Sequence, residues 1–403
     1  MISSQLYRAI FQIYLPSLII SLGTGMIVPA IPLLGSTFGV SVGLAAQVVT
    51  AQVIARFVSW IPSGVVLDRT GIRTGMIIGA SIVVLAALVT AFAPAFWVIL
   101  LAQLFLGIGI NLWLLGRELA AMDLVKVDQR GRQMSALFGI RATGTSLGPA
   151  VGGIILDTQG FRSLFVIFAL MAFVVLIVST TIQSPHSRHP RSREAVFGFT
   201  SLSQVAPVYR ATYFILVLAT FSALLRSSAL DSMLPIYVIN ELGYSATKTG
   251  FMFFIMSVIT FAMIVPAGFI SDKIGRKWAT VPPPLLAGIA FAAYPLLREP
   301  AGLMILAVLL GIAHGMALGS LTTYTYDIVP HHARAQFQAM RRTIGEAGAF
   351  TGPLLGGIIA NTFSAGIAFL LFAPLHLLAA VLLMIKAKES LPGRQKKTAR
   401  KNT

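Results

Sequence analysis

The sequence predicts an all-α membrane protein in which twelve transmembrane helices form two six-helix halves related by pseudo-symmetry. Three observations lead to this prediction. The chain of 403 residues is 56% hydrophobic and only 11% charged, with a mean hydropathy of +0.85, whereas soluble domains are about 25% charged. Apolar runs long enough to cross a bilayer recur along its length. The stretches GTSLGPAVGG and GAFTGPLLGG, which begin at Gly144 and Gly348, share one spacing 204 positions apart.

The individual helices follow from the length of the apolar runs, since a membrane-spanning helix needs about 20 mostly apolar residues. The predicted spans lie near residues 8–31, 44–66, 74–93, 96–119, 134–157, 162–183, 209–238, 247–270, 278–297, 301–325, 337–361 and 365–385. One connection is long, polar and basic, and it divides the spans six and six. The expected organisation is an N-terminal bundle (1–183), a cytoplasmic linker (184–208), a C-terminal bundle (209–387) and a basic cytoplasmic tail (388–403).

Charge and cysteine content narrow the possible classes of protein. The net charge is +17, but the cations gather in the loops on the side of the membrane that the N-terminus shares. This bias predicts a multi-pass protein of the cell membrane with both termini in the cytoplasm. The charge therefore indicates topology and contact with anionic lipid rather than nucleic-acid binding. The sequence contains no cysteine, which excludes disulfides and thiolate metal sites.

The repeat extends beyond one motif and keeps a single register. GVVLDRTG, from Gly64 to Gly71, aligns with GFISDKIG, from Gly268 to Gly275, and Asp123 aligns with Asp327. Charged loop residues rarely coincide in register by chance, so the two halves are related. Because each half has six spans, both enter the membrane from the same side and are parallel repeats.

These residues resemble the major facilitator superfamily, and the resemblance covers essentially the whole chain. GVVLDRTGIR and GFISDKIGRK match the loop motif of that family, while GTSLGPAVGG in the fifth span resembles the motif of its drug–proton antiporter branch. The resemblance implies a monomer with one central cavity that works by alternating access. It further implies a proton-coupled exporter whose partners are a small lipophilic or amphipathic substrate, protons and membrane lipid, with no cofactor, metal or nucleic acid.

Two sets of residues are expected to control the conformational change. The resemblance implies that Asp68 faces the start of span 11, that Arg73 pairs with Asp123 and that Lys277 pairs with Asp327 while the cytoplasmic side is shut. The alternative to these contacts is that each loop is an ordinary turn whose charged side chains are solvated. The loop set comprises Gly64, Asp68, Arg69, Gly71, Arg73 and Asp123, with Gly268, Asp272, Lys273, Gly275, Lys277 and Asp327 as the second copy.

The second set is glycine-rich, and it belongs to spans 5 and 11. Small residues let membrane helices approach closely, and proline permits a bend, so we expect span 5 to pack on span 8 and span 11 on span 2. The alternative to a role in the conformational change is that the glycine–proline pairs only kink these helices for static packing. The residues are Gly144, Gly148, Pro149, Gly152 and Gly153 in span 5, and Gly352, Pro353, Gly356 and Gly357 in span 11.

Ionisable groups inside the spans are the candidate substrate and coupling residues, because charge at bilayer depth is costly. Asp231 and Glu346 are the candidate proton carriers; alternatively, Arg226–Asp231 and Arg141–Glu346 are fixed pairs that hold helices together. The candidate set is Arg56, Arg141, Arg226, Asp231, His314 and Glu346, together with the neutral amide Gln103.

Two departures from the family pattern leave alternatives open. Gln103 stands where the antiporter branch usually has arginine, and the first span has no acid, so Arg56 or Arg141 takes over the coupling role or the protein is a uniporter. An excess of arginine over acid within the spans favours anionic substrates such as organic anions or lipid-like acids. A non-transporting membrane receptor is the alternative from another class. Signatures such as H-E-x-x-H, G-x-S-x-G and the P-loop are missing from the sequence, so an enzyme is not expected.

Overall fold

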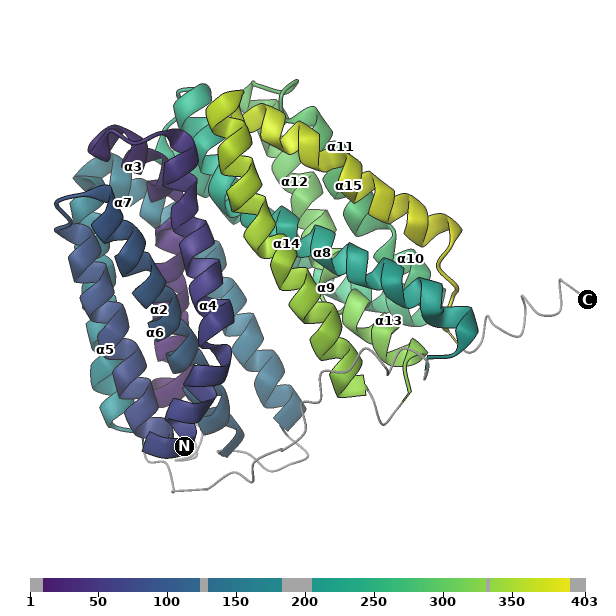
Figure 1. Cartoon of the computed structure of the whole chain (residues 1–403), viewed down its shortest axis with the longest axis horizontal. Coiled ribbons are helices and arrows are strands. Elements are labelled where there is room, and N and C mark those ends of the chain that lie inside the picture. The colour runs from purple at the N-terminus through teal and green to yellow at the C-terminus, as the bar shows by residue number, and fades with distance from the viewer. Residues whose placement is uncertain (1–9, 124–129, 183–204, 331–333, 392–403) are drawn as a thin grey trace, which may run out of the picture. The chain divides into compact units, whose positions relative to one another are not determined.

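The computed structural model describes residues 10–123, 130–182, 205–330 and 334–391, and all regular secondary structure there is helical (Figure 1). The all-α prediction is thereby confirmed. The chain falls into two compact units, one made of Met1–Arg191 with Leu234–Phe254 and the other of Ser192–Met233 with Ile255–Thr403.

The first unit begins with a broken apolar span made of η1 (Ile10–Tyr14), α2 (Leu15–Met26), η2 (Val28–Ala30) and α3 (Ile31–Phe38). It continues with α4 (Val42–Thr70), α5 (Ile72–Ala91), α6 (Phe96–Asp123) and α7 (Arg130–Thr180). The hydroxyl of Ser41 accepts a hydrogen bond from the backbone N–H of Leu44 and so caps the start of α4. Within the unit α2 packs against α7, α5 against α6 and α7, and α4 against α6.

The long helix α7 contains two of the predicted spans. Its backbone turns at Gly160, where φ is +81°, a conformation that residues with a Cβ rarely adopt. The predicted spans 134–157 and 162–183 lie on either side of this glycine. The sequence therefore placed the break between the fifth and sixth crossings within two residues.

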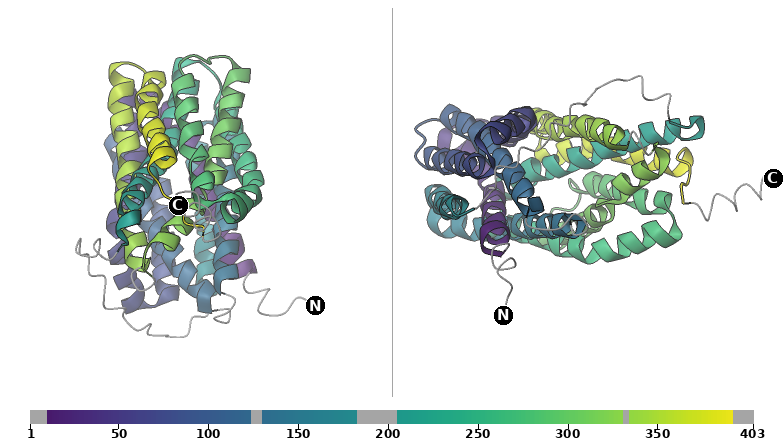
Figure 2. Two further views of the ribbon diagram at one scale, coloured as in Figure 1. Left: turned by 90° about the vertical axis from the view of Figure 1, so that its right-hand side faces the viewer. Right: turned by 90° about the horizontal axis from the view of Figure 1, so that it is seen from below.

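The second unit is built from α8 (Pro207–Pro235), which continues as η5 (Ile236–Glu241), and α9 (Ala246–Phe269), which continues as η6 (Ile270–Ile274). Next come α10 (Arg276–Thr280), α11 (Pro282–Ala293), α12 (Pro300–Ala317), α13 (Ser320–Ile328), α14 (Arg334–Thr362) and α15 (Ala365–Ile385). α15 packs against α11 and α14, and α11 packs against α12 (Figure 1 and Figure 2). The segment Leu234–Phe254, which holds η5 and the start of α9, belongs to the first unit.

Nine helical stretches of the described residues are long and apolar enough to cross a membrane. One of them, Gly139–Thr180, is 42 residues long and holds two crossings. The remaining crossings correspond to α10–α11, which is interrupted by prolines, and to α14, which is rich in polar residues. Large apolar side chains lie exposed along these helices, Val265 being 79% exposed, as expected of a surface that faces lipid.

The glycines of span 5 pack α7 directly onto α2. A Cβ added at Gly148 would lie 2.6 Å from the Cα of Gly25, and one at Gly144 would lie 2.7 Å from the Cβ of Ser21. Gly152 meets the backbone of Met26 in the same way. These three glycines recur every fourth residue and so share one face of the helix. We expected them where span 5 meets span 8, but this face lies against span 1.

The neighbouring face of α7 does meet the start of span 8. Gly153 lies about 100° further round the helix than Gly152. A Cβ added at Gly153 would lie 2.5 Å from the carbonyl oxygen of Ala246, and Gly250 of α9 lies against the backbone of Pro149. The glycine-rich segment of span 5 therefore has two packed faces, one on α2 and one on α9.

Span 11 repeats this arrangement inside the second unit. Gly352 of α14 lies against α8, where an added Cβ would be 2.8 Å from the carbonyl oxygen of Leu225, and Gly356 lies against Met233. Pro353 and Gly357 are buried beside them. The expected packing of span 11 on span 2 would join different units and stays a prediction.

Candidate functional site

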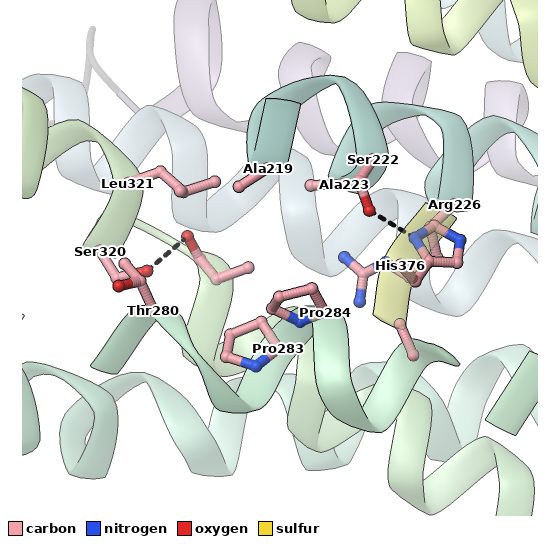
Figure 3. A pocket seen from close by; sticks show the side chains of 12 residues that line it. Ala219, Ser222, Ala223, Arg226, Thr280, Pro283, Pro284, Ser320, Leu321 and His376 are labelled. Carbon is pink, nitrogen blue, oxygen red and sulfur yellow. Dashed lines mark hydrogen bonds between the residues drawn. The ribbon is translucent and has the colours of Figure 1, made fainter. Parts of the chain in front are cut away.

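A pocket lies within the second unit, enclosed by helices from across its sequence (Figure 3). Its empty volume is about 320 Å³, including space open to solvent. α8 supplies one wall, and the prolines that begin α11 supply the opposite wall. The lining residues are Ala219, Ser222, Ala223, Arg226, Thr280, Pro283, Pro284, Ala287, Ala317, Ser320, Leu321 and His376.

Arg226 is the one charged side chain among the described residues that line this pocket. It is only 4% exposed, and its Nη2 lies 3.3 Å from Nδ1 of His314. A guanidinium only donates hydrogen bonds, so this histidine nitrogen accepts and its ring proton sits on Nε2. None of the ion pairs between described residues includes Arg226.

His376 stands beside this cation and is fully buried. Its Nδ1 shares a hydrogen bond with the hydroxyl of Ser222, drawn as a dashed line in Figure 3. Its ring meets Phe291 edge-on, with the ring centroids 4.8 Å apart. Nε2 of His376 has no hydrogen-bond partner among the described residues. Whichever tautomer is present, one polar atom of this buried ring is left unsatisfied.

The structure brings together two of the candidate residues predicted from the sequence, Arg226 and His314. His376 and Ser222 complete the cluster and were missed as site residues. Spacing along one helix could not reveal them, because the cluster combines α8, α12 and α15. A histidine and an arginine in predicted spans were the available signal, since such residues are rare at bilayer depth.

Asp231, a candidate proton carrier on α8, is half-buried and has an interaction partner. It lies five residues after Arg226, about 140° round the helix. Glu346, the other candidate, lies 3.7 Å from Nε of Arg342, one turn earlier on α14. Arg141 is half-buried in the first unit, so its pairing with Glu346 stays a prediction.

Gln103 joins three helices of the first unit. Its Oε1 accepts a hydrogen bond of 2.7 Å from Gln52 of α4, and its Nε2 donates one of 3.2 Å to Thr90 of α5. The amide is 1% exposed and both of its ends are satisfied. Arg56, also on α4, is exposed.

Arg117 of α6 is a second buried cation. Its side chain is completely buried, and its Nη2 lies 3.4 Å from Glu118. Nε and Nη1 have no partner among the described residues.

The second copy of the loop motif is held by a cluster of ion pairs centred on Arg276. Its Nη1 donates to Asp272 at 2.6 Å, and its Nε donates to Asp327 at 2.8 Å. We expected Lys277 to pair with Asp327, so this prediction is wrong by one residue. The turn at Gly275, with φ at +148°, follows the π-helical η6 and aims Arg276 instead.

Glu389, which follows α15, caps the same loop and was not foreseen. Its carboxylate accepts hydrogen bonds from the backbone N–H groups of Arg276, at 2.9 Å, and Lys277, at 3.2 Å. These are the first two residues of α10, so the carboxylate also meets the positive end of that helix. Lys273 of the same loop is exposed.

The first copy of the loop motif has a different environment. Asp68, Arg69 and Arg73 are exposed, and the side chain of Asp123 lies outside the described residues. Gly71 has φ at +84°, a backbone conformation that favours glycine. Gly64 and Gly268 have open space around them among the described residues, so close backbone approach does not explain either glycine.

Asp157, near the C-terminal end of span 5, was also missed. Its carboxylate accepts hydrogen bonds from the backbone N–H groups of Ala246, at 3.2 Å, and Thr247, at 2.8 Å. The hydroxyl of Thr247 donates to it as well. An acid of α7 thus caps the first turn of α9.

Comparison with known proteins places this geometry in a family. The model of the Major Facilitator Superfamily matches residues 13–218 and 216–403. A homolog of the multidrug resistance efflux pump PmrA from Lactococcus lactis is 23% identical, with 89% of each chain covered. The multidrug resistance protein MdtG of a Rahnella strain is 24% identical, with 88% of each covered. The putative niacin/nicotinamide transporter NiaP of Bacillus subtilis is 24% identical over 81% of this chain and 82% of its own.

Solved structures agree at the level of fold. A bacterial homolog of the human lysosomal transporter Spinster, in an inward-facing and occupied conformation, superposes with a TM-score of 0.76 at 17% identity over 94% of this chain and 96% of that one. The D-xylose–proton symporter gives 0.73 at 17% identity over 96% and 99%. The predicted fold of two six-helix halves is confirmed.

Proposed function

Because the chain belongs to the Major Facilitator Superfamily, whose members are transporters and not enzymes, we propose that it is a secondary active exporter driven by the proton gradient. The cargo is a small lipophilic or amphipathic compound. The protein works as a monomer in the cell membrane, with both termini in the cytoplasm, by alternating access between its two halves.

One observation carries this proposal: the glycine-rich segment of α7 presents two faces free of Cβ atoms. Gly144, Gly148 and Gly152 lie on α2, and Gly153 lies on α9. Faces without interlocking side chains can shift along one another at lower cost than knobs seated in holes. Relatives with multidrug efflux names align over most of the chain, which supports export as the direction of transport.

Asp231 and Glu346 remain the proposed proton carriers. A carboxyl group takes up a proton when it is buried and releases it when a cation lies close. Glu346 is partly exposed, with 32% of its side chain accessible, and it already lies near Arg342. A change in its surroundings during the transport cycle would alter that balance.

Transport in everted membrane vesicles tests the proposal. An imposed pH gradient should drive uptake of a lipophilic dye, and Asp231→Asn or Glu346→Gln should abolish the dependence on that gradient. Glu299→Gln, which neutralises an exposed carboxyl group, is the matched control and should behave like the unaltered protein. Proton coupling is refuted if dissipating the gradient leaves uptake unchanged, and the carrier assignment fails if both variants keep their pH dependence.

The pocket in the second unit favours a second candidate function, transport of organic anions. Arg226 is buried without a carboxylate partner, which suits an anionic cargo. The alignment with a putative niacin/nicotinamide transporter is compatible with this candidate. Uptake of nicotinate in the same vesicles, in competition with the dye, separates the two functions.

A further inference from the structure

One helix belongs to both compact units of the molecule. α9 runs from Ala246 to Phe269, yet its residues up to Phe254 group with the first unit and those from Ile255 onward group with the second. Sharp bends in helices occur mostly at proline or glycine, and the stretch 251–265 contains neither. A movement of one unit relative to the other therefore has to detach the first turns of α9 or bend a stiff helix.

The neighbouring helix α8 also passes from one unit to the other, but it contains a weak point. The first unit includes this helix from Leu234 onward, and the π-helical η5 begins directly after Pro235. Proline removes a backbone hydrogen bond, and π-helical turns interrupt the regular bonding of an α-helix. We expect α8 to bend at this position. The attachment of the stiffer α9 to α7 is then the contact that has to open.

This attachment is made by a single face of α7. Pro149, Gly153 and Asp157 recur every fourth residue and so share one side of the helix. The first two bring the backbones of α7 and α9 together without a hydrogen bond, as at Gly153 and the carbonyl oxygen of Ala246. Asp157 adds the directional bonds, from the N–H groups of Ala246 and Thr247 and from the hydroxyl of Thr247.

The start of α9 does not depend on Asp157. Ser245 precedes the helix, and its hydroxyl accepts a hydrogen bond of 3.3 Å from the backbone N–H of Lys248, which is the usual N-cap. Ser41 caps α4 in the same way, and the two serines lie 204 positions apart in the repeat. Because the serine cap is already present, the carboxylate is a second cap, and it comes from another helix.

The strength of this contact suits a bond that opens and closes. Asp157 is exposed and Thr247 is half-buried, so water can take the place of each hydrogen bond as it breaks. An exposed hydrogen bond contributes a small part of the stability of a fold, whereas the separation of a buried ion pair is costly. The contact can therefore break without unfolding either unit.

We propose that Asp157 is a latch that holds the first turn of α9 on α7 in one access state, and that transport requires the latch to open and reclose. In the predicted topology this end of α7 lies on the side of the membrane opposite the two termini, so the closed latch keeps that side shut. Asp157 is a positioning residue, because it acts through α9. The inference rests on the alternating access that we propose, but not on the direction of transport or on protons.

Nitroxide labels on a pair of cysteines test the latch in the purified full-length protein. Thr158→Cys and Lys248→Cys are at exposed positions next to the contact, and the natural chain contains no cysteine. Double electron–electron resonance should give a distance distribution whose shorter component is the latched state. Asp157→Ala should raise the ratio of the longer to the shorter component by about fivefold, the effect of losing one helix cap. Asp157→Asn keeps one acceptor oxygen and should raise it less.

Two variants separate the latch from a purely structural role. Ser245→Ala removes the other cap of the same helix without touching α7, so it should leave the ratio unchanged. Thr247→Val removes only the hydroxyl donor and should raise the ratio by about twofold. It replaces Asp157→Ala as the critical variant if the latter does not elute as a folded monomer.

A cross-link tests the transport cycle itself. A short methanethiosulfonate cross-linker between Asp157→Cys and Thr247→Cys should stop dye transport in vesicles until a reducing agent releases it. Gln12→Cys with Thr181→Cys is the matched control, since these side chains also lie within hydrogen-bond distance between distant segments of the first unit but do not involve α9. Its cross-link should leave transport within about twofold.

The inference is overturned if Asp157→Ala and Thr247→Val keep the distance distribution of the unaltered protein, or if Ser245→Ala shifts it as far as Asp157→Ala. Full transport by the protein cross-linked between positions 157 and 247 would also overturn it. A distribution that responds to Asp157→Ala in a protein without gradient-driven export would refute only the proposed export function. Export together with an unresponsive distribution would refute only the latch.

Discussion

The two copies of the loop motif share a glycine turn but differ in the residue that follows it, which is Ile72 in the first copy and Arg276 in the second. Gly71 and Gly275 both turn the chain through positive φ, at +84° and +148°. Beyond the second turn, Arg276 contacts Asp272 and Asp327, whereas its counterpart in the first copy, Ile72, is an uncharged and buried side chain. The motif therefore encodes a turn, while the residue directly after its last glycine decides whether the turn holds a cluster of ion pairs.

The glycine segments differ in a similar way. Gly148 meets only backbone atoms, those of Gly25 and Leu22, whereas Gly352 meets the side-chain hydroxyl of Ser228 first, at 2.7 Å, and the backbone of Leu225 at 2.8 Å. A side chain can rotate away from an added methyl group, but a backbone cannot. The first half should therefore tolerate less change at this contact than the second.

The largest effect is expected at these glycines. Gly148→Ala should destabilise the protein by about 2–3 kcal/mol through overpacking, and Gly352→Ala should destabilise it less. The thermal unfolding midpoint in detergent measures both, with Gly64→Ala, which has open space around it, as the control. Equal loss in both halves would contradict the difference between the two contacts.

A smaller effect is expected at the loops. Arg276→Gln should cost about 1–2 kcal/mol because it removes two charged hydrogen bonds, while Arg73→Gln, at an exposed position, should cost less than about 0.5 kcal/mol. Lys277→Gln is the matched control, since only its backbone N–H contacts Glu389. Denaturant unfolding measures all three, and a larger loss for Lys277→Gln would restore the pairing expected from the sequence.

The pH dependence of the Arg276 contact has a defined sign. Burial, the largest influence, lowers the pKa of Arg276, but its hydrogen bonds to Asp327 and Asp272 outweigh burial and raise the pKa above its ordinary value. A raised pKa adds stability that is fully present at pH values below the pKa of the unfolded state. This stability is lost only as the pH rises through the higher pKa of the folded state. The arginine contribution should therefore stay constant from neutral pH to strongly alkaline pH.

The contact of Asp157 with the first turn of α9 gives a further test. Asp157→Ala should destabilise the first turn of α9 by about 1 kcal/mol, the usual value of a helix cap, and should speed amide exchange at Ala246 and Thr247. The repeat position in the second half is Asn361, so Asp157→Asn is the conservative comparison and should lose less. Unchanged exchange in Asp157→Ala would contradict the capping role.

The smallest effect is expected on the surface of α14. Arg342→Gln breaks an ion pair of 3.7 Å to Glu346 in which the arginine is 70% exposed. Such pairs contribute about 0.3–0.5 kcal/mol within a helix, and salt screens them further. Urea unfolding should give nearly identical midpoints for the variant and the unaltered protein. A loss of more than about 1 kcal/mol in the free energy of unfolding, roughly twice the upper bound for such a pair, would show a role beyond this pair.

Periodicity and composition were enough to predict the fold. The length of apolar runs located the spans, and Gly160 falls between two of them. The register of the repeat also predicted the turn glycines Gly71 and Gly275. These features are local, so a single stretch of sequence contains the information.

The contacts that define the candidate sites were less predictable because they join distant segments. Arg276 and Lys277 are adjacent, and only the geometry after Gly275 decides which one reaches Asp327. Likewise, Gly144 and Gly153 belong to one motif but face different helices. His376 became a site residue only when α8 and α15 came together.

The contact of Glu389 with α10 has a practical consequence for anyone who shortens or tags this protein. The carboxylate follows the last helix, where a protease site or affinity tag is commonly placed. A chain cut at residue 386 keeps every predicted crossing, yet it leaves two amides at the start of α10 without their acceptor. Transport measured on such a truncated protein would report on a loop that has lost its C-terminal anchor.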